Sequence, residues 1–181
     1  IIVAEDGECF ALHTDVTRAD QVEAMVQQGL DTYGRIDILH NNVGIVEVGG
    51  PVEASEESWD RVMDVNLKSM FLTCKYTLPY MEQQGGGAIV NISSVVGIRY
   101  LGVPYISYSA SKAAILQFTQ SLAVQYAEKN IRANTILPGM MNTPMIVEPL
   151  KDVYADGDVE KMIRMRNEQC PMKKMGDAWD V

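Results

Sequence analysis

The sequence has few cysteines, fewer basic than acidic residues, and no long apolar run. Cys9, Cys74 and Cys170 lie far apart and form no CxxC or Cys/His ligand pattern, so we expect reduced thiols and no metal site. The 15 basic residues against 24 acidic ones give a formal charge of -9, which argues against a nucleic-acid partner. No run reaches the roughly 20 residues that a membrane helix needs. We therefore expect a soluble, cytoplasmic protein with no membrane partner.

The chain instead shows an alternation of strand and helix patterns over the length of one domain. The apolar spacing predicts strands at 9–13, 36–39, 88–92 and 131–137, and helices at 22–33, 59–81 and 105–128. Residues 145–175 hold five of the eleven methionines and have weak periodicity, which suggests a substrate loop or lid. No linker or repeat interrupts the pattern, so residues 1–181 are interpreted as one domain.

Near-continuous apolar strands that alternate with helices indicate an α/β fold with a parallel sheet and helices on both faces. Ligands bind such sheets outside the carboxyl ends of the strands. Four predicted strand ends carry polar or glycine residues: Asp15-Val16, Asn41-Asn42-Val43-Gly44, Ser93-Ser94 and Pro138-Gly139. Each of these by itself is as compatible with a turn or a helix cap as with a site. Their occurrence on one edge favours a ligand site.

Tyr108 and Lys112 provide a candidate for proton transfer. They lie four residues apart on a predicted helix, so both side chains can point into one pocket. A free tyrosine has a pKa of about 10, and a nearby cation lowers it toward the range useful for acid–base catalysis. A surface pair on a helix would show the same spacing, so the motif alone is weak.

Five motifs in order make the pattern specific: Asn41-Asn42-Val43-Gly44, Val65-Asn66, Ile92-Ser93-Ser94-Val95-Val96-Gly97, Tyr108-Ser-Ala-Ser-Lys112 and Pro138-Gly139-Met-Met-Asn-Thr143. Together they resemble the short-chain dehydrogenase/reductase family, over nearly the whole chain. The resemblance implies a Rossmann-like, doubly wound parallel sheet. It also implies transfer of hydride between NAD(P) and a secondary alcohol or ketone.

The resemblance implies a role for four catalytic residues. Tyr108 would exchange a proton with the substrate oxygen, and Lys112 would lower the pKa of Tyr108 and bind the nicotinamide ribose. Ser94 would hold the substrate oxygen, whereas Ser93 is interpreted as structural. Asn66 would anchor a water that relays protons from Lys112; its other interpretation is a helix asparagine that bonds locally.

The resemblance also implies a set of cofactor-binding residues. Asp15 and Val16 would contact the adenine, and Asn42, Val43 and Gly44 its ribose. Many relatives have Ala in place of Val43, so this residue adds bulk near the cofactor. The nicotinamide and a phosphate would be held by a third group, namely Pro138, Gly139, Met141 and Thr143, with Tyr108 and Lys112 also in contact with the cofactor.

The family's glycine-rich motif, which binds the pyrophosphate, does not precede Asp15. We therefore predict a partial domain that is truncated at both ends, and we expect this chain alone to turn over no NAD(P)H. The residue that selects between NAD and NADP is not in the sequence. NAD is preferred slightly, without a specific residue to support it.

Two other functions remain open at this stage. A non-redox epimerase or dehydratase could use the same Tyr108 and Lys112, and a catalytically silent binding protein could keep the fold. We expect a small-molecule alcohol or ketone substrate of moderately apolar character and a homodimer or homotetramer in the full-length protein. The residues expected around the substrate are Tyr100, Leu101, Val103, Met145, Ile146, Val147 and Leu150, whereas His13 and His40 are interpreted as structural.

Overall fold

The computed structural model describes residues 2–181 and contains a three-stranded parallel sheet in the order β1-β2-β3. The strands are β1 (Ile38–Asn41), β2 (Gly87–Ile92) and β3 (Ile131–Ile136). Leu39 pairs with Ile89, and Ile89 pairs with Ala133, so these three side chains lie on the same face of the sheet. The α/β class with a Rossmann-like parallel sheet is confirmed.

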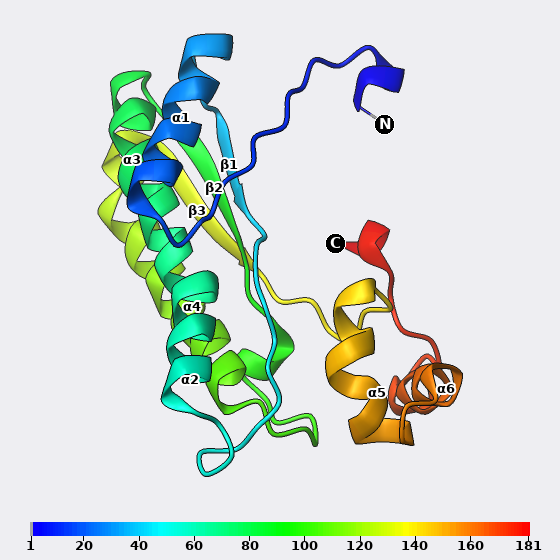
Figure 1. Cartoon of the computed structure of the whole chain (residues 1–181). Coiled ribbons are helices and arrows are strands. Elements are labelled where there is room, and N and C mark those ends of the chain that lie inside the picture. The colour runs from blue at the N-terminus through cyan, green and yellow to red at the C-terminus, as the bar shows by residue number, and fades with distance from the viewer. Residues whose placement is uncertain (1) are drawn as a thin grey trace.

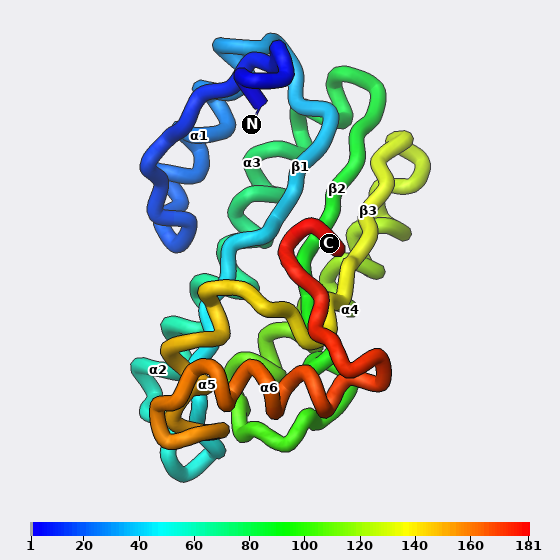
Figure 2. Tube along the Cα trace, turned by 90° about the vertical axis from the view of Figure 1, so that its right-hand side faces the viewer, coloured from blue at the N-terminus to red at the C-terminus, as the bar shows by residue number. Residues whose placement is uncertain are grey.

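Residues 2–181 form six α-helices: α1 (Ala19–Tyr33), α2 (Glu56–Met63), α3 (Ser69–Gln83), α4 (Ile106–Gln125), α5 (Val147–Ala155) and α6 (Val159–Gln169). Figure 1 shows α1, α3 and α4 on one side of the sheet, and α5 and α6 near the carboxyl ends of the strands. Figure 2 shows α5 and α6 side by side, with the C-terminal segment next to them. Within residues 2–181, no helix is both long enough and apolar enough to span a membrane.

The main core lies between the sheet and this layer of helices. Ile89 of β2 packs there with Cys74 and Leu78 of α3 and Leu122 of α4. On the opposite face of the sheet, Ile38 is 67% exposed. Residues 2–181 thus supply helices to one face of these strands, where we expected cover on both (Figure 1).

The predicted strand at 9–13 is wrong. These residues form no strand, and Phe10 and Leu12 are exposed. A strand needs a partner for its backbone N–H and C=O groups, and none of the described strands lies beside this segment. Phe10 instead stacks on Tyr33 of α1 with ring centres 5.6 Å apart.

The predicted helix at 59–81 is longer than expected and contains an irregular turn. It begins after Ser55, whose side chain accepts a hydrogen bond from the backbone N–H of Ser58 at 3.1 Å. Between α2 and α3 the chain forms a π turn over Asp64–Lys68, with Asn66 fully buried at its centre. Single π turns inside α-helices are frequent at functional sites.

Candidate active site

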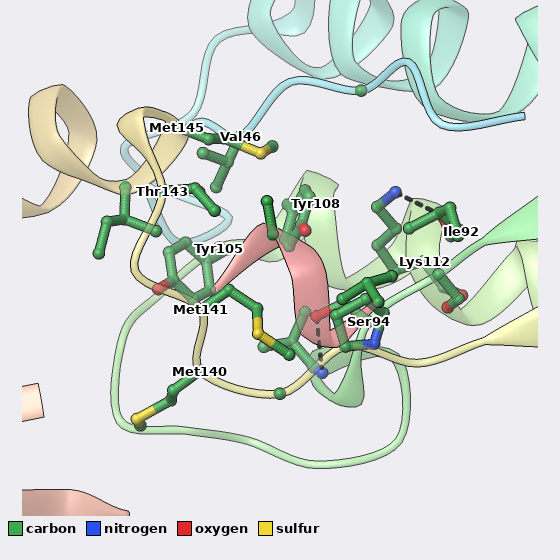
Figure 3. Close-up of a pocket in the computed structure, with 18 of the residues that line it drawn as sticks. Val46, Ile92, Ser94, Tyr105, Tyr108, Lys112, Met140, Met141, Thr143 and Met145 are labelled. Atoms are coloured by element: carbon green, nitrogen blue, oxygen red, sulfur yellow. Dashed lines mark hydrogen bonds between the residues drawn. The ribbon is translucent and has the colours of Figure 1, made fainter. Parts of the chain in front are cut away.

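A cavity of about 720 Å³ lies at the carboxyl ends of the strands. Figure 3 shows Ser94, Tyr108 and Lys112 at the cavity; Ser94 comes from the segment after β2, and Tyr108 and Lys112 come from α4. Most of the predicted site residues line this cavity: Asn42, Val43, Gly44, Ser94, Tyr108, Lys112, Pro138, Gly139, Met141 and Thr143. The fold therefore brings together residues that are up to about 100 positions apart in the sequence.

Two predicted cofactor residues are not brought to the cavity. Asp15 and Val16 are absent from its lining. The carboxylate of Asp15 accepts hydrogen bonds from the N–H and the hydroxyl of Thr17, at 2.9 and 2.7 Å. These bonds lower the pKa of Asp15. The assignment of Asp15 and Val16 to the adenine stays a prediction.

Lys112 is a buried cation on α4. Its side chain is 3% exposed, and its Nζ donates a hydrogen bond to the carbonyl oxygen of Ile92 at 2.8 Å (Figure 3). Among the described residues no carboxylate forms an ion pair with it. Burial disfavours the charged form and lowers the pKa of Lys112 to about 8.

Tyr108 does not have the lowered pKa that we predicted. Burial raises the pKa of its phenol above the usual 10.0, and the hydroxyl of Ser94 offsets part of this rise. The Nζ of Lys112 is 5.6 Å from the ring centre and donates to Ile92 instead. Removal from water is thus the larger influence on the pKa of Tyr108, and the phenol holds its proton at neutral pH.

The segment after β2 fixes Ser94 relative to α4. Ser93 donates its hydroxyl to the carbonyl oxygen of Lys112 at 2.6 Å, which agrees with its interpretation as structural. A Cβ on Gly97 would lie 2.8 Å from the carbonyl carbon of Lys112, closer than real contacts allow. The Oγ of Ser94 accepts a hydrogen bond from the N–H of Val96 at 3.4 Å and lies beside the Tyr108 phenol.

Asn66 lies behind the cavity and holds the loop after β1. Its Oδ1 accepts from the N–H of Ile45 at 2.8 Å, and its Nδ2 donates to the carbonyl oxygen of Ile45 at 2.9 Å and to Ser111 Oγ at 3.0 Å. Both amide hydrogens thus have protein partners, while Oδ1 keeps a second lone pair. A positioning role follows from these bonds, and the water relay stays a prediction.

Gly44 gives the site room for a cofactor. A Cβ at this position would lie 3.3 Å from Asn66 Oδ1 and 3.4 Å from Lys112 Nζ. A side chain at this position would press on both groups, so glycine lets the backbone pass close to them. The segments at Asn42 and Pro138 open on the same cavity. These residues fit the nicotinamide and ribose part of a dinucleotide, whereas the sequence contains no glycine-rich pyrophosphate loop ahead of Asp15.

A family model described as short chain dehydrogenase matches residues 2–153. The chain belongs to the short-chain dehydrogenase family. An oxidoreductase of Thermotoga maritima with no assigned activity is 40% identical over 182 residues, which cover 100% of this chain and 70% of the relative.

Two solved structures that are similar to this chain carry cofactors. An NAD+-bound xylitol dehydrogenase has a TM-score of 0.86 and 29% identity, covering 96% of this chain and 70% of its own. The protein ElxO with NADP bound has a TM-score of 0.82 and 30% identity, covering 98% and 68%. The chain thus spans about two thirds of the length of these relatives.

Four of the seven residues expected around the substrate line the cavity. Leu101, Met145, Ile146 and Leu150 line the cavity, whereas Tyr100, Val103 and Val147 do not. His40, interpreted as structural, also lies on the lining.

Three polar residues of the lining were not predicted from the sequence, namely Tyr105, Tyr154 and Arg166. One signal could have revealed Arg166. It shares the helix stripe of Val159, Met162 and Ile163 on α6, where a charged residue is out of place.

Proposed function

We propose that this short-chain dehydrogenase transfers hydride between NAD or NADP and a secondary alcohol or ketone, with Tyr108 as the proton donor and acceptor. The observation that carries the proposal is the meeting of Ser94, Tyr108 and Lys112 on one cavity, lined also by the strand-end loops. A general acid must lie within hydrogen-bond reach of the group that it protonates, and the side chains of Ser94 and Tyr108 both line the cavity in which that group would bind.

In the proposed mechanism the side chains of this protein transfer the proton and position the substrate. The hydroxyl of Ser94 hydrogen-bonds the reacting oxygen, and Tyr108 donates its proton to that oxygen during ketone reduction. The raised pKa of Tyr108 keeps this proton available at neutral pH. In alcohol oxidation the phenol must first be ionised, so that direction is favoured at higher pH.

The bound cofactor would accept or supply the hydride. Lys112 would hold its nicotinamide ribose, and Asn42, Val43 and Gly44 would lie against its adenine ribose. The nicotinamide and a phosphate would be held by Pro138, Gly139, Met141 and Thr143. Asp15 and Val16 would contact the adenine. The relatives include both an NAD+-bound and an NADP-bound protein, so the slight preference for NAD requires a direct comparison of the two cofactors.

The proposal includes a homodimer or homotetramer in the cytoplasm. Phe71 on α3 and Val124 on α4 are both exposed apolar residues on the outer helices. A second copy of the chain that packed on α3 and α4 would cover both side chains.

Substitution of Tyr108 tests the mechanism in the full-length protein that we predict. Tyr108→Phe removes only the hydroxyl, and we expect turnover to fall by about 10²–10⁴-fold while the affinity for NAD(P)H stays within about twofold of wild type. Turnover is measured as the change in absorbance of NAD(P)H, and affinity by quenching of protein fluorescence.

The matched control is Tyr100→Phe, which removes a hydroxyl from a residue that is 76% exposed and lies outside the cavity. This variant should keep wild-type turnover. Retained turnover in Tyr108→Phe would contradict the assigned role. Conversion of substrate without any net change in NAD(P)H would instead identify an epimerase or dehydratase.

A further inference from the structure

Arg166 is a buried cation that the proposed mechanism does not use. It lies on α6 and is 6% exposed, yet it lines the same cavity as Ser94 and Tyr108. Its guanidinium carbon is 5.5 Å from the ring centre of Tyr154 on α5. Its charge also favours ionisation of the neighbouring Tyr105, against the burial that raises the pKa of Tyr105 to about 12.

The guanidinium of Arg166 has unsatisfied hydrogen-bonding capacity. Its Nε is buried and donates to no acceptor. Within residues 2–181 no carboxylate lies within ion-pair distance of it, whereas four other arginines have such partners: Arg18, Arg35, Arg61 and Arg164. Burying an arginine without an anion is strongly unfavourable, so a ligand that supplied one would stabilise this arrangement.

The charge of the cavity also favours an anionic ligand. Its lining includes Lys112 and Arg166 but no Asp or Glu, although the chain as a whole carries a net charge of -9. Lys112 already donates to the carbonyl of Ile92. Arg166 is therefore the cation of the lining whose Nε has no acceptor and which has no carboxylate partner within residues 2–181, in a cavity that would attract anions.

Tyr105 connects Arg166 with the reacting end of the cavity. The rings of Tyr105 and Tyr108 meet edge to face with centres 5.8 Å apart (Figure 3). Arg166 lies next to both Tyr105 and Tyr154. A molecule could thus place its reacting oxygen at Tyr108 and a second group at Arg166. Contacts with Tyr154 and Tyr105 would explain the position of the guanidinium but leave its Nε without an acceptor.

We propose that Arg166 binds an anionic group, a carboxylate or a phosphate, on the alcohol or ketone that reacts at Tyr108. This inference rests on the proposed function of the site. A guanidinium suits either group, because its planar N–H donors match two oxygens at once. Arg166 would then select the charged members of the substrate class over neutral ones, since a neutral substrate leaves it unpaired.

The first experiment compares charged and neutral ketones in the full-length protein. The probes are acetoacetate, levulinate and 5-oxohexanoate, each with its methyl ester, so that the distance from ketone to charge varies. For at least one pair, wild type should show a kcat/KM about tenfold or more higher for the acid. Arg166→Met should remove that preference while leaving the KM for NAD(P)H unchanged. Arg166→Lys should restore part of it.

The matched control is Arg164→Met, which removes the same charge from an exposed position on the same helix. It should keep the preference for the acid. Equal kcat/KM values for acids and esters in wild type would overturn the proposal, and so would a preference that survives in Arg166→Met.

The second experiment measures binding without turnover, by titration calorimetry. Wild type should bind butyrate or ethyl phosphate at least about tenfold more tightly than butyramide, and Arg166→Met should not. Tighter binding of ethyl phosphate than of butyrate would identify a phosphate as the group bound. Equal binding of all three would overturn the proposal. Selective anion binding in a protein that reduces no ketone would support the Arg166 site and reject the proposed function.

Discussion

At the scale of single residues, burial decides the chemistry of the site. Lys112 and Tyr108 are four positions apart, and from spacing alone we expected the cation to lower the pKa of the phenol. In the folded chain both groups have lost water, which lowers the pKa of Lys112 and raises that of Tyr108. Each group thereby favours its neutral form, the state in which Tyr108 can act as an acid.

The pKa of Lys112 predicts how stability depends on pH. Below about pH 8 the folded and unfolded chains both carry this charge, so its burial destabilises the fold in full. Between about pH 8 and the ordinary value of 10.5, the folded chain has already released the proton while the unfolded chain still holds it. Stability therefore rises with pH in this window, by about 2 kcal/mol between roughly pH 7 and 9.5.

This pH effect is measured against Lys112→Met, which lacks the titrating group. The free energy of unfolding of each protein is obtained from urea titrations across this pH range. The wild type should gain relative to the variant as pH rises. Burial raises the pKa values of Cys74 and Tyr105 to about 12, so these two groups lower the stability as pH rises. They do so in both proteins, and their effects cancel when the variant is subtracted from the wild type. A difference in unfolding free energy that stays constant with pH would show that Lys112 has the same pKa in the folded and unfolded states.

At the scale of elements, the long helix between Ser55 and Gln83 positions the site through one irregular turn. The π turn at Asp64–Lys68 places Asn66 in contact with Ile45 and Ser111. The apolar periodicity predicted a helix through this stretch but not its widened turn. That turn depends on bonds to two segments distant in sequence.

The start of this helix offers a direct test of local stabilisation. Ser55 caps α2 by accepting a hydrogen bond from the N–H of Ser58. Ser55→Ala leaves that N–H without its partner, and we expect a loss of about 1 kcal/mol in the free energy of unfolding. The midpoint of urea unfolding, at unchanged slope, measures this loss.

Ser55→Asp is the control, because aspartate caps helices as well as serine does. It should retain most of the wild-type stability. An equal loss in both variants would assign the effect to packing around the hydroxyl rather than to the cap.

The helices α5 and α6 form from the region predicted as a lid. They share a second buried cluster with the loop before α4, through Val103, Tyr105, Leu150 and Met162. This cluster brings Tyr154 and Arg166 to the cavity. The methionine-rich composition indicated apolar packing but not which partner it would contact.

At the scale of the whole molecule, stability should be distributed unevenly. The strand β2 is paired on both edges and lies over the main core. In contrast, the segment before α1 belongs to no described strand, and its Phe10 and Leu12 are exposed. Amides in such segments exchange through small local openings, whereas core strands require larger ones.

Hydrogen exchange of the 181-residue chain should reveal this difference. We expect the amides of Ile89 and Asn91 to be among the slowest, and those of Phe10 and Leu12 to exchange close to the rate of an unstructured peptide. Mass spectrometry after proteolysis resolves the two regions. Comparable protection in both would mean that the N-terminal segment is paired in solution.

The local pattern of the sequence determined much about this protein. Apolar periodicity predicted α1, α4 and the three strands that the structure contains, and the motifs identified the family before any fold was known. The strand-end rule predicted that Asn42, Ser94 and Pro138 would share one cavity, and they do. These predictions succeed because hydrogen-bonding geometry and side-chain period act over a few residues.

Tertiary structure alone decided the rest. The segment at 9–13 has strand composition but no partner strand, so its pattern could not determine its conformation. The pKa of Tyr108 depends on how much water the fold removes. Arg166 became a cavity residue only because α6 packs against the loop that holds Tyr105. Pairing, desolvation and charge in a cavity all depend on groups far apart in the chain, so residue spacing could point to Tyr108 and Lys112 but not to their protonation states.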